Sequence, residues 1–351
     1  MSTRTRRKKK LIIWYVTIGI FMLIVLAFTA FLAVKAAGKN SLKNRAVTAS
    51  PLTSSAMLDT ETGGDGEGLI SRNGVKYRFN ENLYTILCMG IDAKGTTITD
   101  KAELGEGSQS DANFLLVLDS ENKKISVLAI PRDTMTDIDV CDVFGQYYNT
   151  VEAQLALQYA YGDGGTGSCQ EMEKAVSNLL YNLPIHAYVS VDLNAIPVVN
   201  DAVGGVTVEV LEDINAGGYS MKKGETVTLK GKQARVYVQE RDTNVDYSAH
   251  SRLMRQKQYL TVFMKQAMSK TKEDITLPLT IYNSLTEYMI TDITASEITY
   301  LATVAMGCSF SEDNFYVVPG EQQKGYIYEE YRVDEDALYD LMLEIFYVPV
   351  Q

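Results

Sequence analysis

The chain contains few histidines: among its 351 residues, only His186 and His250 carry an imidazole. A zinc site made of several histidines, or a Ser-His-Asp triad, therefore has little material to draw on. His186 opens an apolar run and is expected to be packed, whereas His250 lies in a polar turn and is expected to be solvated. Neither residue predicts a catalytic site.

Motifs for nucleotide binding and for cysteine-bound metals are also missing. No Gly-x-x-x-x-Gly-Lys-Ser/Thr occurs, and no Gly-x-Gly-x-x-Gly directly follows a strand-like run, which disfavours both common modes of nucleotide binding. No Cys-x-x-Cys spacing occurs either, so a zinc ribbon is not expected. In an exported domain, Cys141 and Cys169 fit either a disulfide or two free thiols. The apolar surroundings of Cys88 predict a buried thiol.

Positive charge is scarce beyond the N-terminus. The chain has 33 Lys and Arg against 44 Asp and Glu, for a net charge of −11. The first ten residues carry +6, which leaves −17 on residues 11–351. Non-specific nucleic-acid binding needs clustered Lys and Arg, so no nucleic-acid partner is expected. A phosphate ligand would need local arginines and a bridging cation.

Residues 11–34 are 24 consecutive positions without charge. A membrane-spanning helix needs about 20 predominantly apolar residues, whereas the apolar part of a cleaved signal peptide has only about 7 to 15. The length therefore favours an uncleaved transmembrane helix. The basic tail, residues 1–10, is expected to stay cytoplasmic under the positive-inside rule. The sequence predicts a single-pass protein of the cell membrane whose C-terminal part is extracellular.

Residues 35–76 are polar and rich in small side chains, which predicts a flexible extracellular linker. Residues 77–351 are expected to form one domain in which strands alternate with helices. The predicted strands lie near 84–91, 113–119, 124–130 and 186–191, and the predicted helices near 151–161, 170–182, 251–269 and 295–306. Ser168 and Glu171 fit a capping box for the second of these helices. This alternation predicts an α/β fold with a mixed central β-sheet flanked by helices on both faces.

Charged residues stand at the ends of the predicted strands. Asp92 ends the run YTILCMGID, Asp111 begins the run that leads into FLLVLD, and Arg132 and Asp133 end ISVLAIPRD. Ligands of open α/β sheets bind at such strand ends. We therefore expect these side chains to share one site, with carboxylates for a divalent cation and an arginine for phosphate.

The predicted helix near 251–269 adds further cations. Arg252, Arg255 and Gln256 have the i, i+3, i+4 spacing of one helical face. Arg241 and Asp246 lie just upstream, near a helix N-terminus whose N–H groups favour an anion. Because guanidinium groups bind phosphate oxygens bidentately, this arrangement predicts a diphosphate site. A solvated basic stripe is the alternative interpretation.

The order of the blocks GID, SDAN, IPRD, DAVGGV, LKGKQARVYVQER and RLMRQ resembles the LytR-CpsA-Psr family of membrane-anchored cell-wall enzymes. These blocks extend over about residues 80–270. The resemblance implies a phosphotransferase that moves a glycopolymer, such as teichoic acid or capsular polysaccharide, from undecaprenyl pyrophosphate to a peptidoglycan hydroxyl group. Undecaprenyl phosphate would be released, and a pyrophosphatase side activity would accompany the transfer.

The same resemblance implies roles for individual residues. Asp92 and Asp111 would hold Mg²⁺ or Mn²⁺ on the pyrophosphate. Its oxygens would be bound by Arg132, Arg241, Arg252, Arg255 and Gln256. Phosphoryl transfer depends mainly on positioning and charge neutralisation. Asp133 or Asp246 would either take the proton of the acceptor hydroxyl group or orient an arginine.

The chain departs from the family pattern at three places. Gln239 replaces the first arginine of the pair that ends at Arg241, in a segment expected to be a strand. Lys94 stands where an arginine often follows GID, and residues 93–109 form a longer insertion. The lost cation at position 239 favours an alternative function, a non-catalytic scaffold or regulator that binds polyprenyl phosphates or wall polymer. The two metal-binding aspartates favour the enzyme.

Overall fold

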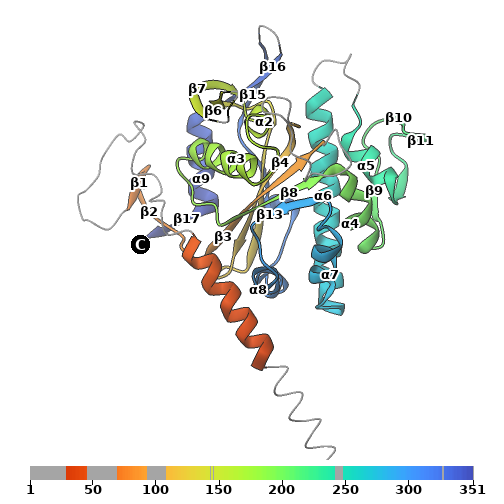
Figure 1. Cartoon of the computed structure of the whole chain (residues 1–351), viewed down its shortest axis with the longest axis horizontal. Coiled ribbons are helices and arrows are strands. Elements are labelled where there is room, and N and C mark those ends of the chain that lie inside the picture. The colour runs from red at the N-terminus through yellow and green to blue at the C-terminus, as the bar shows by residue number, and fades with distance from the viewer. Residues whose placement is uncertain are drawn as a thin grey trace, which may run out of the picture.

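The computed structural model describes residues 29–45, 69–92, 108–142, 144, 146–241, 248–325 and 328–350. In this part of the chain, six strands form a central sheet (Figure 1). Their order is β13 (Met289–Thr291), β8 (Ala187–Asp192), β3 (Leu83–Ile91), β4 (Ser110–Asp119), β5 (Lys124–Ile130) and β14 (Phe315–Val317). β3 pairs antiparallel with β4 and parallel with β8, and β5 pairs antiparallel with β4 and parallel with β14. The mixed sheet and its four predicted strands are confirmed.

Helices cover both faces of this sheet, because alternate strand residues point to opposite sides. Leu87, Met89 and Leu115 pack with α2 (Ala156–Ala160), α3 (Thr166–Leu179) and α9 (Glu335–Phe346). Ile86 and Leu118 belong to the core beside α6 (Ser248–Glu273) and α8 (Ala295–Met306). The central strands are almost wholly buried because neither face meets water. The predicted helices near 251–269 and 295–306 are confirmed as α6 and α8.

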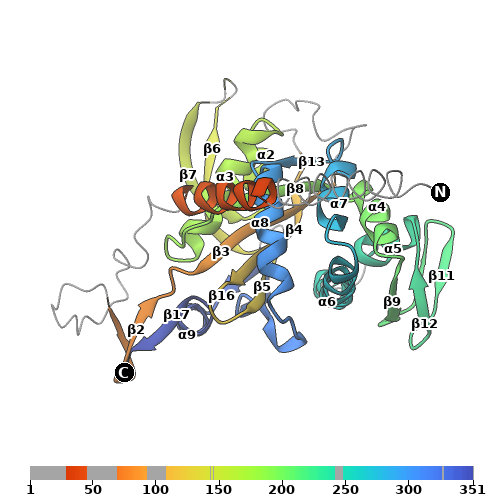
Figure 2. The ribbon, with the colours of Figure 1, turned by 90° about the horizontal axis from the view of Figure 1, so that it is seen from below.

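Shorter elements surround the central sheet. β9 (Val206–Glu209) pairs with β12 (Thr226–Leu229) and packs with α4 (Ile196–Ala202), α5 (Lys232–Gln239) and α6. Figure 2 shows this layer at one side of the molecule. The remaining elements are β1 (Ile70–Arg72), β2 (Val75–Phe79), β6 (Met135–Cys141), β7 (Tyr147–Gln154), β10 (Ile214–Ala216), β11 (Tyr219–Met221), α7 (Leu277–Ser284), β15 (Gly320–Lys324), β16 (Glu329–Val333), β17 (Tyr347–Val350) and the 3₁₀ turns Leu193–Ala195 and Glu312–Asn314.

Three local predictions are wrong. The helix expected over 151–161 forms only in its second half, as α2, because β7 pairs antiparallel with β6 as far as Gln154. Ser168 does not cap α3, which begins at Thr166; its Oγ donates to the Tyr159 carbonyl at 2.7 Å. The segment before Gln239, expected to be a strand, is the helix α5.

The predicted linker has regular structure at both ends. Residues 29–45 are helical, and Leu42 in this helix is fully buried. At the other end, Ile70 of β1 belongs to the main core, and β2 pairs with β17. The folded part therefore begins before residue 77. Residues 1–28, which hold most of the predicted span, and residues 46–68 lie outside the described ranges.

Among the helices in the described ranges, none combines the length and apolarity that crossing a membrane requires.

All four cysteines are free thiols, so the disulfide between Cys141 and Cys169 is not formed. Cys169 is fully buried in α3, next to Tyr159 and Ser190. Burial raises the pKa of its thiol to about 12, so it remains protonated and unreactive at neutral pH. Cys141 ends β6 and is partly exposed.

His186 is packed against the sheet, as its sequence context predicts. It is 8% exposed, and its Nδ1 accepts from the Thr85 backbone N–H at 3.2 Å. Burial lowers the pKa of the imidazole to about 4. Because the unfolded chain takes up this proton near pH 6.5 and the folded chain does not, His186 destabilises the fold as the pH falls from 6.5 towards 4.

We therefore expect His186→Asn to reduce the acid sensitivity of the fold. An asparagine oxygen can still accept from the Thr85 N–H but does not titrate. Between pH 7.5 and pH 5, the free energy of unfolding of the wild type should fall by about 2 kcal/mol more than that of the variant. Urea unfolding at both pH values measures this difference. Equal losses in the two proteins would contradict the assigned pKa.

Candidate functional site

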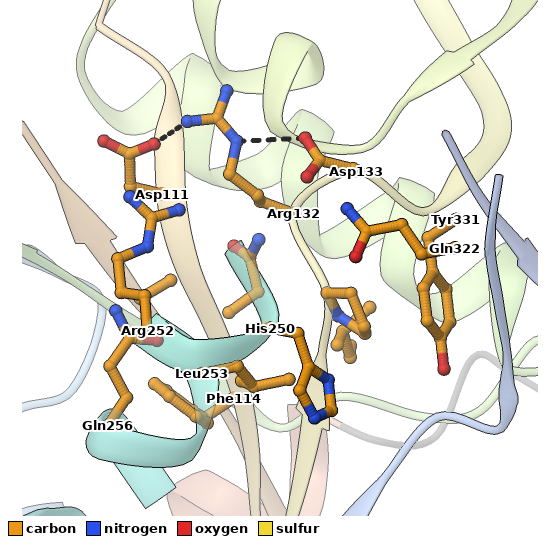
Figure 3. A pocket seen from close by; sticks show the side chains of 14 residues that line it. Asp111, Phe114, Arg132, Asp133, His250, Arg252, Leu253, Gln256, Gln322 and Tyr331 are labelled. Atoms are coloured by element: carbon orange, nitrogen blue, oxygen red, sulfur yellow. Dashed lines mark hydrogen bonds and ion pairs between the residues drawn. The ribbon is translucent and has the colours of Figure 1, made fainter. Parts of the chain in front are cut away.

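A pocket opens at the edge of the central sheet where β4 begins and β5 ends (Figure 3). It encloses about 520 Å³, including open solvent at its mouth. The first turns of α6 and the hairpin of β15 and β16 complete its wall. The side chains that line it are Asp111, Ala112, Asn113, Phe114, Ile130, Pro131, Arg132, Asp133, His250, Arg252, Leu253, Gln256, Gln322 and Tyr331.

Strand pairing brings Asp111 and Arg132 together. Asn113 pairs with Ile130 in the antiparallel register of β4 and β5, so the start of one strand lies beside the end of the other. Arg132 Nη1 donates to Asp111 Oδ1, and Arg132 Nε lies 3.3 Å from Asp133 Oδ1 (Figure 3). The three side chains are only 14–19% exposed. The structure therefore brings Asp111, Arg132 and Asp133 together at the strand ends, as the sequence predicts.

Arg252 reaches the same pocket from the first turns of α6. It is only 7% exposed. Its pKa is lowered to about 10, first by burial and then by the positive charges of Arg241 and Arg132, while Asp133 partly offsets them. Burial likewise lowers the pKa of Arg132, and the negative charge of Asp133 acts in the opposite direction. Three guanidinium groups thus gather where water is scarce, and an anionic ligand would relieve their repulsion.

The carboxyl group of Asp133 lies among these cations. Burial raises its pKa, although Arg132, Arg252 and Arg241 act in the opposite direction. Its Oδ1 also accepts from Gln154 Nε2 at 3.2 Å. Asp246, the other proposed proton acceptor, lies outside the described residues.

Asp92 lies at the same edge of the sheet but does not line the pocket. Gly90 of β3 pairs with Ala112 of β4, which puts Asp92 and Asp111 at neighbouring strand ends. Asp92 Oδ2 accepts from Gln239 Nε2 at 3.1 Å, and Asp92 Oδ1 lies 3.4 Å from Arg235 Nη2. Its side chain is 44% exposed. The structure therefore points Asp92 towards α5.

Arg235 is a residue that the sequence interpretation missed. Its Nε donates to Gln239 Oε1 at 2.7 Å, so the two side chains form a pair one helical turn apart. Arg235 thus supplies the cation that Gln239 lacks beside Asp92. The i, i+4 signal is visible only if residues 232–239 are recognised as helix, and this segment was expected to be a strand.

Arg255, expected to bind pyrophosphate, does not line the pocket. It is 1% exposed, and its guanidinium donates to the carbonyls of Tyr237 and Glu240 and, at 2.7 Å, to Glu212 Oε1. Arg252 and Arg255 lie about 60° apart around the α6 axis, as 3.6 residues per turn requires. Arg255 therefore satisfies carbonyls at the C-terminus of α5, where cations are favourable.

Gln256 remains in the pocket wall, and its Nε2 donates to the Val238 carbonyl at 3.2 Å. Two further lining residues, Gln322 and Tyr331, come from β15 and β16, far along the sequence. His250, expected only to be solvated, also lines the mouth. No sequence signal marks these three, because their placement depends on where the C-terminal hairpin and the start of α6 pack.

The donor set suits a hard divalent cation. Mg²⁺ is usually held by one or two carboxylates together with phosphate oxygens and water, and Asp92 and Asp111 offer two carboxylates at adjacent strand ends. Within the described ranges, no cluster of three or more His, Cys, Asp or Glu could hold a metal ion by itself. The two carboxylates would need phosphate oxygens and water as further ligands. The fold and this site together define an α/β protein with a cationic pocket suited to a phosphorylated ligand.

Comparison with known proteins identifies the family. The sequence model of the LytR_cpsA_psr family matches residues 52–342. The chain belongs to the LytR-CpsA-Psr family, which confirms the resemblance seen in its motifs.

Two relatives carry functional names. The polyisoprenyl-teichoic acid–peptidoglycan teichoic acid transferase TagU of Oceanobacillus iheyensis is 30% identical over 192 residues, which cover 54% of this chain and 53% of TagU. The protein of the same name from Bacillus licheniformis is 27% identical over 256 residues, covering 72% and 70% of the two chains. The chain thus matches about half of the first relative and over two thirds of the second.

Solved structures share the fold. Protein gbs0355 from Streptococcus agalactiae superposes with a TM-score of 0.61 at 21% identity, covering 75% of this chain and 86% of its own. Bacillus subtilis TagV superposes with a TM-score of 0.57 at 24% identity, covering 75% and 96%. The mixed α/β architecture is therefore that of the family.

Proposed function

We propose that the protein is a membrane-anchored, extracellular phosphotransferase that attaches a teichoic acid or related glycopolymer from an undecaprenyl pyrophosphate carrier to peptidoglycan. Family membership and the names of the transferase relatives support this proposal. The observation that carries it is the pocket lined by Arg132, Arg252 and Asp133, with the charge of Arg241 acting on the same groups. Such a concentration of buried positive charge is suited to a diphosphate, whose charge it would neutralise.

In this mechanism the arginines bind and orient the pyrophosphate. Arg252 is held by the packing of α6 and keeps its N–H donors in the pocket. Arg132 can replace its hydrogen bond to Asp111 with one to a phosphate oxygen. Asp92 and Asp111 would hold Mg²⁺ or Mn²⁺, which neutralises charge on the pyrophosphate. Arg235 and Gln239 keep Asp92 oriented at the sheet edge.

Asp133 is the proposed acceptor of the proton. Its raised pKa brings the carboxylate closer to the basicity that a general base needs near neutral pH. The peptidoglycan hydroxyl oxygen bonds to the phosphorus that carries the glycopolymer, and its proton passes to Asp133. The bond between this phosphorus and the bridging oxygen breaks, and undecaprenyl phosphate leaves with the bridging oxygen. Water in place of the hydroxyl group would give the pyrophosphatase side reaction.

The test uses full-length protein in detergent, a lipid-linked glycopolymer and peptidoglycan. We expect transfer to require Mg²⁺ or Mn²⁺ and to stop when a chelator is added. Asp111→Asn should need about tenfold more metal for half-maximal rate, because mass action offsets weaker binding. Asp137→Asn changes an exposed carboxylate of β6 and is the matched control.

Two results would contradict this proposal. Full transfer in the presence of chelator would exclude a role for the metal. Binding of the lipid-linked polymer without any transfer, under all metal conditions, would favour the non-catalytic scaffold instead.

A further inference from the structure

The helix over residues 29–45 packs against the domain beside α8 (Figure 2). At Gly38 the two backbones nearly touch: a Cβ atom at this position would lie 2.2 Å from the Ser296 carbonyl oxygen. No real Cβ comes so close to a backbone atom, so only glycine permits this approach. The helix is therefore fitted to the first turn of α8.

One turn further on, Leu42 enters the core. It is 0% exposed and belongs to the same apolar cluster as Tyr84 and Leu118 of the sheet and Tyr300 and Leu301 of α8. Removing a leucine side chain from water is favourable, so this burial stabilises the docked helix. This contact ties the helix to the sheet as well as to α8.

Arg45 completes the contact with charge. Its Nη1 lies 2.5 Å from Asp292 Oδ2, and its Nη2 lies 3.0 Å from Glu297 Oε1. The Glu297 side chain is 0% exposed and also accepts from the Thr294 backbone N–H in the capping box of α8. Arg45 is thus the counter-ion of a buried carboxylate, and its removal would leave that charge unpaired.

These three residues share one face of the helix, at spacings of four and three positions. Lys39 and Lys43, on other faces, are exposed. A solvated stalk would not show one face with a glycine contact, a buried leucine and a paired arginine. The arrangement is that of a built interface within the chain.

Through this interface, the helix over residues 29–45 has a fixed position relative to the pocket. α6 has 26 residues, about 39 Å at 1.5 Å per residue, and the pocket lies at its first turns. α8 contacts both α6 and α7. Figure 1 shows the N-terminal half of the helix projecting past α8, on the side where α7 lies and away from the start of α6.

We propose that the helix over residues 29–45 is a docked arm, held by Gly38, Leu42 and Arg45, which fixes the orientation of the pocket relative to the membrane. The orienting role rests on the membrane anchor and lipid-linked substrate proposed above, whereas the docking does not. The arm would fix the height of the pocket above the bilayer, where the pyrophosphate of the carrier and the peptidoglycan acceptor have to meet.

Docking is tested by hydrogen exchange on full-length protein in lipid vesicles. Amides of residues 38–45 should exchange at least about tenfold faster in Gly38→Leu and Arg45→Ala than in the wild type. Ala37→Leu and Lys43→Ala change exposed neighbours and should leave these rates unchanged. Amides of β3 and β4 report whether the domain itself stays folded. Equal exchange of residues 38–45 in all five proteins would overturn the docked arm.

Orientation is tested by transfer with two presentations of the lipid-linked polymer. With substrate and enzyme in the same vesicles, Gly38→Leu and Arg45→Ala should lose about tenfold in rate, whereas detergent-dispersed substrate should be used at the wild-type rate. Equal loss in both presentations, or no loss in vesicles despite faster exchange, would overturn the orienting role. Absence of transfer by the wild type in detergent would reject the proposed function and leave the exchange result standing.

Discussion

Replacing Arg252 with alanine is expected to lower kcat/KM for glycopolymer transfer by about 1000-fold, because a buried charged donor at the developing phosphate charge is lost. Arg252 is 7% exposed and lines the pocket with Arg132, and the charge of Arg241 acts on it from nearby. Since its pKa is lowered by burial and by those neighbouring cations, the site without ligand is under electrostatic strain. Loss of one cation should therefore leave the free energy of unfolding unchanged or slightly raise it.

Two further variants separate charge from shape. Arg252→Lys keeps the charge but loses the planar fork, so it should recover only part of the rate. Lys265→Ala removes an exposed cation of the same helix, paired with Glu312, and should transfer at the wild-type rate. Steady-state transfer assays and urea unfolding measure both properties. Transfer by a folded Arg252→Ala protein at more than a tenth of the wild-type rate would remove the arginine pocket from the mechanism.

The central sheet could be predicted because its strands have simple causes. The runs that end at Ile91, Asp119 and Ile130 are short and mainly apolar, as is typical of strands that are buried on both faces of a sheet. α8 has a sequence-visible start, since Thr294 and Glu297 form a true capping box. Three-residue edge strands such as β13 and β14 carry no such pattern, because their pairing with β8 and β5 decides them.

The site was only partly predictable, for a related reason. Arg132 and Asp111 meet because strand register follows from an antiparallel connection. The different directions of Arg252 and Arg255 depend instead on where α5 ends and what it packs against. Their spacing alone suggested a shared ligand, but Arg255 is held by the carbonyls of Tyr237 and Glu240, whereas Arg252 lines the pocket. Tertiary contacts decided which arginine is left for a ligand.

Arg255 is therefore expected to act on stability. Arg255→Ala should lower the free energy of unfolding by about 2 to 4 kcal/mol, because it leaves the buried Tyr237 carbonyl and the partly buried Glu240 carbonyl without this donor and breaks the pair with Glu212. Glu212 is 42% exposed, so the loss comes mainly from the carbonyls. Arg255→Lys should recover little, since one ammonium group cannot reach all three acceptors in the geometry of the fork.

The two arginines of α6 thus predict opposite results. Arg252→Ala should remove transfer and keep the urea midpoint, whereas Arg255→Ala should shift the midpoint and, at low temperature where the fold persists, keep most of the transfer rate per folded molecule. Measuring both quantities on both variants tests the assignment directly. If Arg255→Ala were as stable as the wild type and as inactive as Arg252→Ala, its guanidinium would have to leave the end of α5 and bind the pyrophosphate, because only a ligand contact would then explain the loss.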